Sequence, residues 1–224
     1  MITLHHLENS QSIKILWLLE ELGLDYEFKM YDREPTLLAP KEYKAISPLG
    51  TAPAITDGDL ALSESNAIID YILDRYGEGR LRPAVGAPEH VKYLFWFHAA
   101  QGSIQPLTTM NFVHGVVVDR MPFLFRPILR MALGGLAKNM IDPRLDAALA
   151  VMERDLASSD WLAGDALTAA DIAMCYGTHS LESAGAFQGR LPRCQAYAER
   201  MRAHPSYQRA LAKDGKYTGT PQPA

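Results

Sequence analysis

Three polar residues stand where the first helix of the chain is expected to begin. Asn9, Ser10 and Ser12 precede or open a helical pattern over residues 10–22. Hydroxyl groups and unpaired backbone N–H groups meet the positive end of the helix dipole at such a position, so they can donate hydrogen bonds to a bound anion. Serine and asparagine are also common N-caps, and Asn9 or Ser10 could serve only to begin the helix.

A second polar pair stands at the start of another predicted helix. Glu64 and Ser65 come directly after a hairpin pattern and open an apolar stripe over residues 64–76. The serine hydroxyl and the first N–H groups of the helix can bind a carboxylate, and the glutamate can bind an ammonium group. The simpler interpretation is an N-cap with an acidic residue in the first turn.

Patterns typical of other chemistries are missing from the sequence. Cys175 and Cys194 are its two cysteines, form no Cys-x-x-Cys pair and are expected to pack within helices. The adjacent His5-His6 is no metal site by itself, and no other histidine, cysteine or carboxylate set has the spacing of metal ligands. There is no glycine-rich phosphate loop. We therefore expect no metal ion and no other bound cofactor.

The composition is that of an ordinary globular protein. The chain has 224 residues, of which 48% are hydrophobic and 21% charged, and this excludes a fibrous or wholly disordered protein. Its formal net charge of −4 is too small to indicate a nucleic acid or an anionic membrane as partner. Residues 93–118 lack charged side chains, but too many polar residues interrupt them for a membrane span. Few cysteines and no recognisable signal peptide favour the cytoplasm.

The first 80 residues alternate between strand and helix patterns. Strands are predicted, in chain order, for residues 2–7, 26–31, 54–56 and 60–63. Helices are predicted for residues 10–22, which end at Gly23, and for residues 64–76. The first two strands and the helix between them favour a parallel pair with a right-handed crossover. Asp57-Gly58 favours a tight antiparallel hairpin between the last two strands. The expected order is β-α-β, an irregular stretch over residues 37–47, and β-β-α.

Everything after the glycine- and proline-rich stretch near residue 80 keeps helical spacing. Helices are expected over residues 89–118, 123–157, 169–184, 192–203 and 205–213, the second with breaks at Pro127, Gly134-Gly135 and Pro143. Thr168 and Asp171 form a capping box for the third of them. These patterns predict a first domain over residues 1–80, a linker over 81–88 and an all-helical domain over 89–224.

Several segments, in this order along the chain, resemble the glutathione S-transferase family. They are Asn9-Ser-Gln-Ser-Ile-Lys14, Leu16-Trp-Leu-Leu-Glu-Glu-Leu-Gly23, Ser47-Pro-Leu-Gly-Thr-Ala-Pro-Ala54, Ser63-Glu-Ser-Asn-Ala-Ile-Ile-Asp-Tyr-Ile72 and Gly164-Asp-Ala-Leu-Thr-Ala-Ala-Asp-Ile172. The likeness spans nearly the whole chain. It is closest to the serine-type bacterial and fungal branches, because no tyrosine ends the first strand. The resemblance implies an α/β plus all-α fold, with a thioredoxin-like βαβ-ββα domain before the all-helical domain.

The resemblance also implies a role for the first polar group. A free thiol of pKa about 8.5 is only a few per cent thiolate at neutral pH, and the thiolate is the nucleophile. Ser10 holds the position that matches the family's catalytic serine, whose hydroxyl donates to the glutathione sulfur. Ser12 or Asn9 could turn toward the sulfur instead. No cysteine lies near Ser10, which argues against the thiol reductases of the family.

Four further residues match the family's glutathione-binding positions. Pro53 is expected to follow a cis peptide bond, so that the backbone of Ala52 pairs with the cysteinyl unit of glutathione as an added strand would. Glu64 and Ser65 are expected to hold the ammonium and carboxylate of the γ-glutamyl unit.

The residue that binds the glycyl carboxylate is left open. The family often places a cation or glutamine near position 51, but Thr51 cannot neutralise a carboxylate. Lys41 or Lys44 could replace it, and each could equally be a solvated surface charge.

The electrophile is expected between the domains, against the first helical segments of the second domain. The candidates are Trp96, His98, Gln101, Gln105, Met110 and Phe112, followed by Met121, Phe123 and Phe125. An apolar wall with a few polar groups suits a hydrophobic pocket. The same side chains could instead be helix-bundle core or dimer contacts.

The resemblance therefore predicts a cytosolic, homodimeric glutathione transferase. It would add the thiolate of glutathione, as co-substrate, to small hydrophobic electrophiles and could also reduce organic hydroperoxides. The alternative is a non-catalytic protein of the same fold that binds glutathione or hydrophobic ligands, or that acts as a regulator.

Overall fold

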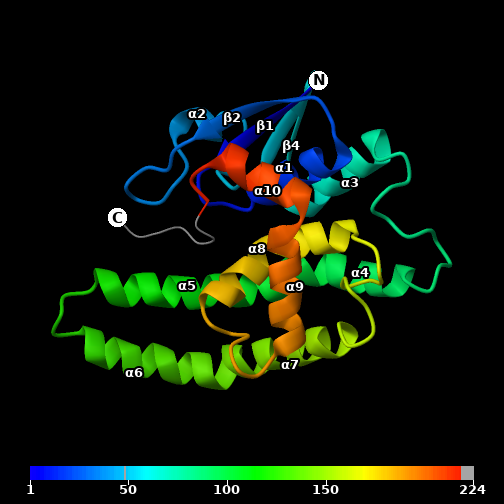
Figure 1. Ribbon diagram of the computed structural model, residues 1–224. Coiled ribbons are helices and arrows are strands. Elements are labelled where there is room, and N and C mark those ends of the chain that lie inside the picture. Colours follow the sequence, from blue (N-terminus) through cyan, green and yellow to red (C-terminus); the bar gives the residue numbers. More distant parts are fainter. Residues whose placement is uncertain (48, 218–224) are drawn as a thin grey trace.

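A computed structural model describes residues 1–47 and 49–217 of the chain. A four-stranded sheet with its helices forms one layer, and a bundle of helices packs against it (Figure 1). The strands are β1 (Ile2–Leu7), β2 (Tyr26–Tyr31), β3 (Ala54–Asp57) and β4 (Leu60–Ser63). Their order across the sheet is β2-β1-β3-β4, with β1 parallel to β2 and antiparallel to β3, and β3 antiparallel to β4. The predicted thioredoxin-like order of strands is confirmed.

The helices continue through the rest of the described chain. They are α1 (Ser12–Leu22), α2 (Lys41–Lys44), α3 (Ser65–Tyr76), α4 (His90–Ala99), α5 (Gln105–Arg120), α6 (Arg126–Leu136), α7 (Asp142–Asp155), α8 (Ala169–Ser183), α9 (Pro192–Ala203) and α10 (Pro205–Asp214). Two π-helical segments, η1 (Ala100–Ile104) and η2 (Ala137–Ile141), join α4 to α5 and α6 to α7. From His90 onward the described residues include no strand, as the prediction of a helical second half requires.

Two helix predictions differ from the structure in their interior. The segment predicted as one helix over residues 89–118 contains η1, where Ile104 packs so closely on Gly177 that a β-carbon there would lie 2.8 Å from an Ile104 methyl. The glycine pair predicted as a break stays inside α6, and the helix continues into η2. Pro127 and Pro143 lie in the first turns of α6 and α7. Backbone N–H groups there have no partner within the helix, so the missing N–H of proline costs no hydrogen bond.

The first helix begins two residues later than the sequence predicts. Its first residue is Ser12, and Ser10 accepts a hydrogen bond from the Ser12 backbone N–H at 3.2 Å instead of standing inside the helix. Gly23 ends the helix in the left-handed conformation at φ 66°, as predicted.

Helix α1 joins the two layers of the molecule. Every residue from Ser12 to Leu19 is buried, because α1 packs against β1, α3, α8 and α10. Apolar residues of both layers therefore form one continuous core. The Trp17 ring meets the Tyr207 ring of α10 at 4.7 Å between centroids, and its N–H donates to Ser206 Oγ at 2.8 Å.

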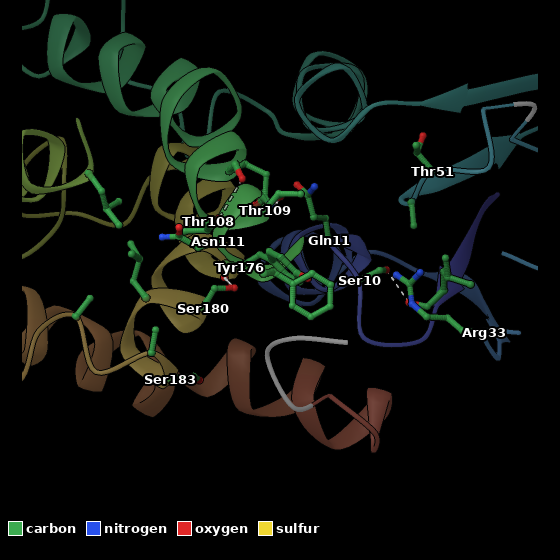
Figure 2. A pocket seen from close by; sticks show the side chains of 18 of the residues that line it. Ser10, Gln11, Arg33, Thr51, Thr108, Thr109, Asn111, Tyr176, Ser180 and Ser183 are labelled. Carbon is green, nitrogen blue, oxygen red and sulfur yellow. Dashed lines mark hydrogen bonds between the residues drawn. The ribbon is translucent and has the colours of Figure 1, made fainter. Parts of the chain in front are cut away.

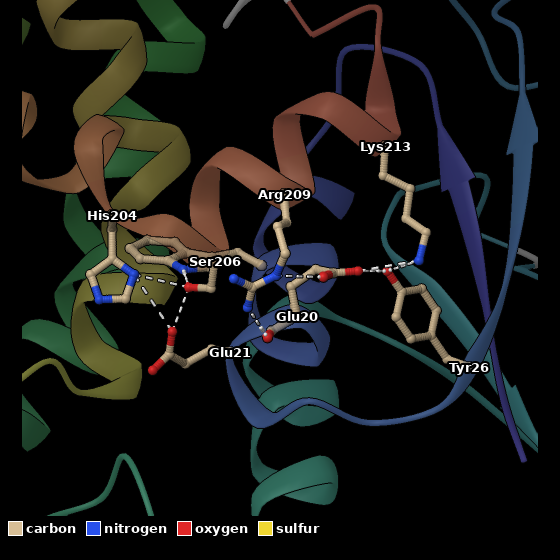
Figure 3. A network of polar contacts seen from close by, with 8 residues as sticks. Glu20, Glu21, Tyr26, His204, Ser206, Arg209 and Lys213 are labelled. Atoms are coloured by element: carbon tan, nitrogen blue, oxygen red, sulfur yellow. Dashed lines mark hydrogen bonds and ion pairs between the residues drawn. The ribbon is translucent and has the colours of Figure 1, made fainter.

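Polar contacts also fasten α10 to α1 at the edge of this core (Figure 3). Glu20 pairs with Arg209 and Lys213, both at 3.2 Å, and also accepts a hydrogen bond from Tyr26 at 2.6 Å. Tyr26 and Lys213 thus bring β2 into the same network. The last helix of the described residues is consequently held on α1 and β2 of the strand-bearing layer.

Within the described residues, no helix is long and apolar enough to cross a membrane, and no three histidine, cysteine or acidic side chains cluster so as to hold a metal ion. Both cysteines are free and buried, and burial raises the pKa of the Cys175 thiol to about 12. These cysteines pack as the sequence predicts.

Candidate functional site

A cavity of about 600 Å³ opens between the two layers (Figure 2). The strand-bearing layer contributes the loop after β1, the start of α1, Arg33 and the segment 50–52. The helical layer contributes side chains from α5, α7 and α8. The residues that line it are Leu7, Ser10, Gln11, Arg33, Gly50, Thr51, Ala52, Gln105, Thr108, Thr109, Asn111, Phe112, Leu145, Tyr176, Ser180, Leu181, Ser183, Ala184 and Ala186. Apolar walls with a few polar groups are typical of a small-molecule site.

Ser10 lies in the wall of this cavity, where α1 begins. Its hydroxyl donates to the Leu7 carbonyl oxygen at 2.6 Å. The Ser12 hydroxyl lies 2.8 Å from Ser10 Oγ and donates to it, because the Ser10 proton is already used. Ser10 can therefore donate to a bound anion only by turning its proton away from Leu7. An ionised acceptor favours that exchange, since charge-assisted hydrogen bonds are about twice as strong as neutral ones.

The two alternatives to Ser10 lie differently. Ser12 is fully buried and does not line the cavity, and its hydroxyl accepts a hydrogen bond from the Leu7 N–H at 3.4 Å. Asn9 has a positive φ of 45° and is 9% exposed. Of the three polar residues, only Ser10 borders the cavity.

The segment before β3 presents Ala52 to the cavity. The Ala52-Pro53 peptide bond is cis, as the family resemblance implies. Tyr43 and Ser47 both donate their hydroxyl protons to the Thr51 carbonyl, at 3.2 and 2.9 Å, and so fix the approach to the cis bond. Among the described residues, the Ala52 backbone forms no hydrogen bond, which leaves it open to an extended ligand. Pro53 is buried behind it.

Glu64 and Ser65 lie at the start of α3 and do not line the cavity themselves. Glu64 has a positive φ of 77°, a strained conformation for a residue with a side chain. Ser65 is 2% exposed and donates to Gln11 Oε1 at 3.4 Å, and Gln11 lines the cavity. Of the pair predicted to bind a γ-glutamyl unit, Ser65 is thus linked to the cavity wall through Gln11.

A buried lysine completes this link. The Lys14 ammonium is fully buried and donates to the same Gln11 Oε1 at 2.7 Å. Burial lowers the pKa of Lys14 to about 8. Two donors hold the Gln11 oxygen, so its amide N–H groups remain to face the cavity. Lys14 ends the Asn9–Lys14 segment that resembles the family. Helical periodicity predicts charged residues on the surface, so the sequence did not indicate that Lys14 is buried beside the site.

Arg33 and Tyr176 are among the cavity residues that the sequence predictions did not name. Arg33 follows β2, and Tyr176 comes from the middle of α8. Figure 2 shows the Tyr176 ring between the Ser10 and Arg33 side and the α5 side of the cavity. The predicted parallel pairing of the first two strands could have indicated Arg33. In the structure Leu7 lies opposite Tyr31, so the residues that follow β1 and β2 lie at the same edge of the sheet.

Neither candidate for the glycyl carboxylate, Lys41 or Lys44, is a lining residue of the cavity. Lys41 and Lys44 are exposed residues of the short helix α2. Neither forms an ion pair with another described residue. The Lys44 side chain nevertheless lies beside Gly50, which lines the cavity.

The predicted electrophile residues divide into three groups. Gln105 and Phe112 line the cavity. Trp96 lies in the core at 1% exposure, and its indole N–H donates to Asp155 at 3.1 Å. His98, Gln101, Met110, Met121, Phe123 and Phe125 are at least partly exposed and do not line the cavity. The cavity takes its apolar wall from Phe112, Leu145, Leu181 and Tyr176 instead, because α7 and α8 close it from the far side.

Comparison with known proteins identifies relatives along most of the chain. Residues 4–80 match the family model of the glutathione S-transferase N-terminal domain, and residues 135–214 match that of the C-terminal domain. Glutathione S-transferase 3 of Schizosaccharomyces pombe is 36% identical over 176 residues, which are 79% of this chain and 72% of that protein.

Solved structures agree with these matches. A glutathione S-transferase from Actinobacillus pleuropneumoniae is 35% identical, with a TM-score of 0.73 over 97% of this chain and 94% of that one. A glutathione transferase family member from Pseudomonas fluorescens, solved with two glutathione molecules bound, is 26% identical, with a TM-score of 0.73 over 94% and 92% of the two chains.

Proposed function

Because this chain belongs to the glutathione S-transferase family and is a glutathione transferase, we propose that it joins the thiolate of glutathione to hydrophobic electrophiles in the cavity between its two layers. The observation that carries the proposal is the position of Ser10 and Ala52 on one wall of that cavity. Ala52 offers an unpaired backbone to the cysteinyl unit, and Ser10 offers a hydroxyl to its sulfur. Glu64 and Ser65 would bind the γ-glutamyl end of glutathione, as the resemblance to the family implies.

The electrophile would occupy the helical side of the cavity. Phe112, Leu145 and Leu181 supply apolar contacts there, and Gln105 and Tyr176 supply polar groups. Such a wall accepts apolar molecules of varied shape, because it has few directional groups. We therefore propose broad acceptance of small hydrophobic electrophiles.

The same thiolate could reduce an organic hydroperoxide. Sulfur attacks the distal peroxide oxygen and the O–O bond breaks, which releases the alcohol after protonation. A second glutathione then attacks the sulfenic acid, giving glutathione disulfide and water. Two thiols are oxidised and one hydroperoxide is reduced. The described residues have no cysteine in the cavity wall, so both thiols would come from glutathione.

We also propose that the protein is a cytoplasmic homodimer. Its two thiols are free, which fits a reducing compartment. Val91, Leu94 and Phe95 are 73%, 41% and 53% exposed and share one face of α4, so a second copy would shield apolar surface there.

The dimer prediction is tested by sedimentation. The wild-type protein is expected at twice the mass of the chain, and Phe95→Glu should shift it toward the monomer because a buried unpaired carboxylate is costly. Gln208→Glu is the control, because Gln208 is an exposed residue of α10 and lies outside this face of α4. A wild-type protein that sediments as a monomer at all accessible concentrations contradicts the proposal.

The activity prediction compares Ser10→Ala with Ser12→Ala. Calorimetry with reduced glutathione should show saturable binding to all three proteins, and the wild type should turn over an aromatic halide. Ser10→Ala should lower kcat/KM about tenfold, because one hydrogen bond to a charged acceptor is worth about 1.5 kcal/mol. Ser12→Ala should have a smaller effect, since Ser12 only supports Ser10. Binding without turnover across electrophiles and hydroperoxides would favour the non-catalytic alternative.

A further inference from the structure

Arg33 is a half-buried cation on the cavity wall, next to Ser10 (Figure 2). Backbone carbonyls hold its guanidinium in place. The Nε atom donates to the Glu8 oxygen at 2.8 Å, and Nη1 donates to the Leu37 oxygen at 2.7 Å. Nη2 lies 3.5 Å from the Asn9 oxygen. These three contacts fix the guanidinium against the loop that leads directly into Ser10.

Carbonyl groups orient this charge but do not neutralise it. Among the described residues, no carboxylate lies within 4.0 Å of the Arg33 guanidinium. The Glu8 carboxylate instead accepts the Arg33 backbone N–H at 3.2 Å. Burial lowers the pKa of Arg33, and Tyr176 and Glu8 only partly oppose this effect. A partly buried cation without an ionic partner is unfavourable, and an anion in the cavity would relieve that cost.

Ser10 alone is a weak source of stabilisation for such an anion. Its proton already goes to the Leu7 oxygen at 2.6 Å, so donation to sulfur exchanges one hydrogen bond for another. The net gain is the difference between a charged and a neutral acceptor. The start of α1 adds its N–H groups and dipole, and a positive charge near the sulfur would lower the thiol pKa further.

We propose that Arg33 is a further catalytic residue, whose guanidinium stabilises the thiolate of bound glutathione beside the Ser10 hydroxyl. The proposal rests on the proposed function, since it assumes that glutathione occupies this wall. The parallel strands β1 and β2 end at one sheet edge, and this edge brings the two residues together. The thiol proton leaves to solvent, and the charge of Arg33 remains opposite the sulfur. Arg33 thus lowers the thiol pKa without accepting a proton itself.

The test is the pKa of the bound thiol in Arg33→Met, measured from the ultraviolet absorbance of the thiolate against pH. An opposite charge at contact distance shifts a pKa by about 1–3 units. We expect the bound thiol pKa to rise by about one unit, which lowers the thiolate fraction and kcat/KM about tenfold at pH values below the wild-type thiol pKa. Lys29→Met is the matched control, because it removes an exposed positive charge from β2. The thiol pKa should not change in that control.

The same titration with γ-glutamylcysteine separates the thiolate of glutathione from its glycyl carboxylate. This dipeptide keeps the thiol and lacks the glycyl carboxylate. We expect Arg33→Met to raise the thiol pKa equally in both ligands. If instead the variant weakens glutathione binding, leaves γ-glutamylcysteine binding intact and changes neither thiol pKa, Arg33 binds the glycyl carboxylate and the proposal is overturned.

Two further variants keep the test decisive. Arg33→Gln removes the charge and retains a donor for one carbonyl, so it replaces the methionine variant if circular dichroism shows that the latter is unfolded. Arg33→Lys keeps a charge without the planar fork and should restore part of the shift. An unchanged thiol pKa in a folded neutral variant that still binds glutathione overturns this proposal alone. Failure of the wild type to bind glutathione overturns the proposed function with it.

Discussion

Replacing Ser65 with alanine should raise the dissociation constant for glutathione about 10- to 100-fold and leave the fold intact. A hydrogen bond to an ionised group contributes about 1.5–3 kcal/mol, and each 1.4 kcal/mol is a factor of ten in affinity. Ser65 is 2% exposed at the first position of α3, where unpaired N–H groups also favour a carboxylate. The hydroxyl has one described partner, Gln11 Oε1 at 3.4 Å, which is a long contact that a carboxylate can replace.

Truncated ligands locate the loss of affinity on glutathione. Cysteinylglycine lacks the γ-glutamyl unit, so the wild-type protein should bind it weakly and Ser65→Ala should bind it equally weakly. Ser158→Ala is the matched control, because that hydroxyl follows α7 and donates to the Asp155 carbonyl oxygen at 3.4 Å. If Ser65→Ala weakens both ligands by the same factor, or neither, the γ-glutamyl assignment is wrong.

The strands and most helix ends followed from local chemistry. Alternation in residues 26–31 and the Asp57-Gly58 turn predicted β2 and the β3–β4 hairpin, and α9 has the predicted bounds. Gly23 ends α1 at a positive φ that residues with side chains seldom adopt. Such features depend on a few neighbouring residues, so sequence alone determines them.

Features that arise between distant segments could not be predicted in this way. Period 3.6 showed one apolar face of α1, but α8 and α10 cover the rest, which buries Lys14 as well. The π-helical segment η1 lies where Ile104 packs on Gly177, a contact across 73 positions of the chain. The pattern of apolar residues in one helix does not indicate which other helices will cover its remaining faces.

In the candidate site, too, local motifs could be predicted and contacts between distant segments could not. Ser10, Ala52 and Gln105 were found because motifs or a predicted interdomain cleft pointed to them, and all three line the cavity. Trp96 was expected in the same wall, yet Asp155 holds its indole N–H in the core. Whether an aromatic side chain lines a cavity or packs in the core depends on which helix lies opposite it. Local sequence patterns do not show which helices pack together.

The buried carboxylate of Asp171 is expected to matter most for stability. It is fully buried, and each of its oxygens accepts two hydrogen bonds. Oδ2 accepts the backbone N–H and the hydroxyl of Thr168, both at 2.9 Å, and the bond from the backbone N–H is one half of the predicted capping box. Oδ1 accepts the Leu162 N–H at 3.0 Å and the Tyr197 hydroxyl at 3.1 Å. One side chain thus joins the start of α8 to the preceding loop and to α9.

Asp171→Ala should therefore destabilise the protein by about 3–5 kcal/mol, because it leaves several buried donors without an acceptor. For a chain of this size, such a loss lowers Tm by about 10 °C, which calorimetry will measure. Burial raises the pKa of Asp171, whereas its four donors favour the ionised form. Asp171→Asn keeps the shape but turns one acceptor into a donor, so an intermediate loss is expected. Asp165→Ala, an exposed aspartate of the same loop, should change Tm little. An equal small change in Asp171→Ala would mean that the four hydrogen bonds do not hold α8 in place, and that packing alone fixes the helix that carries Tyr176 into the cavity.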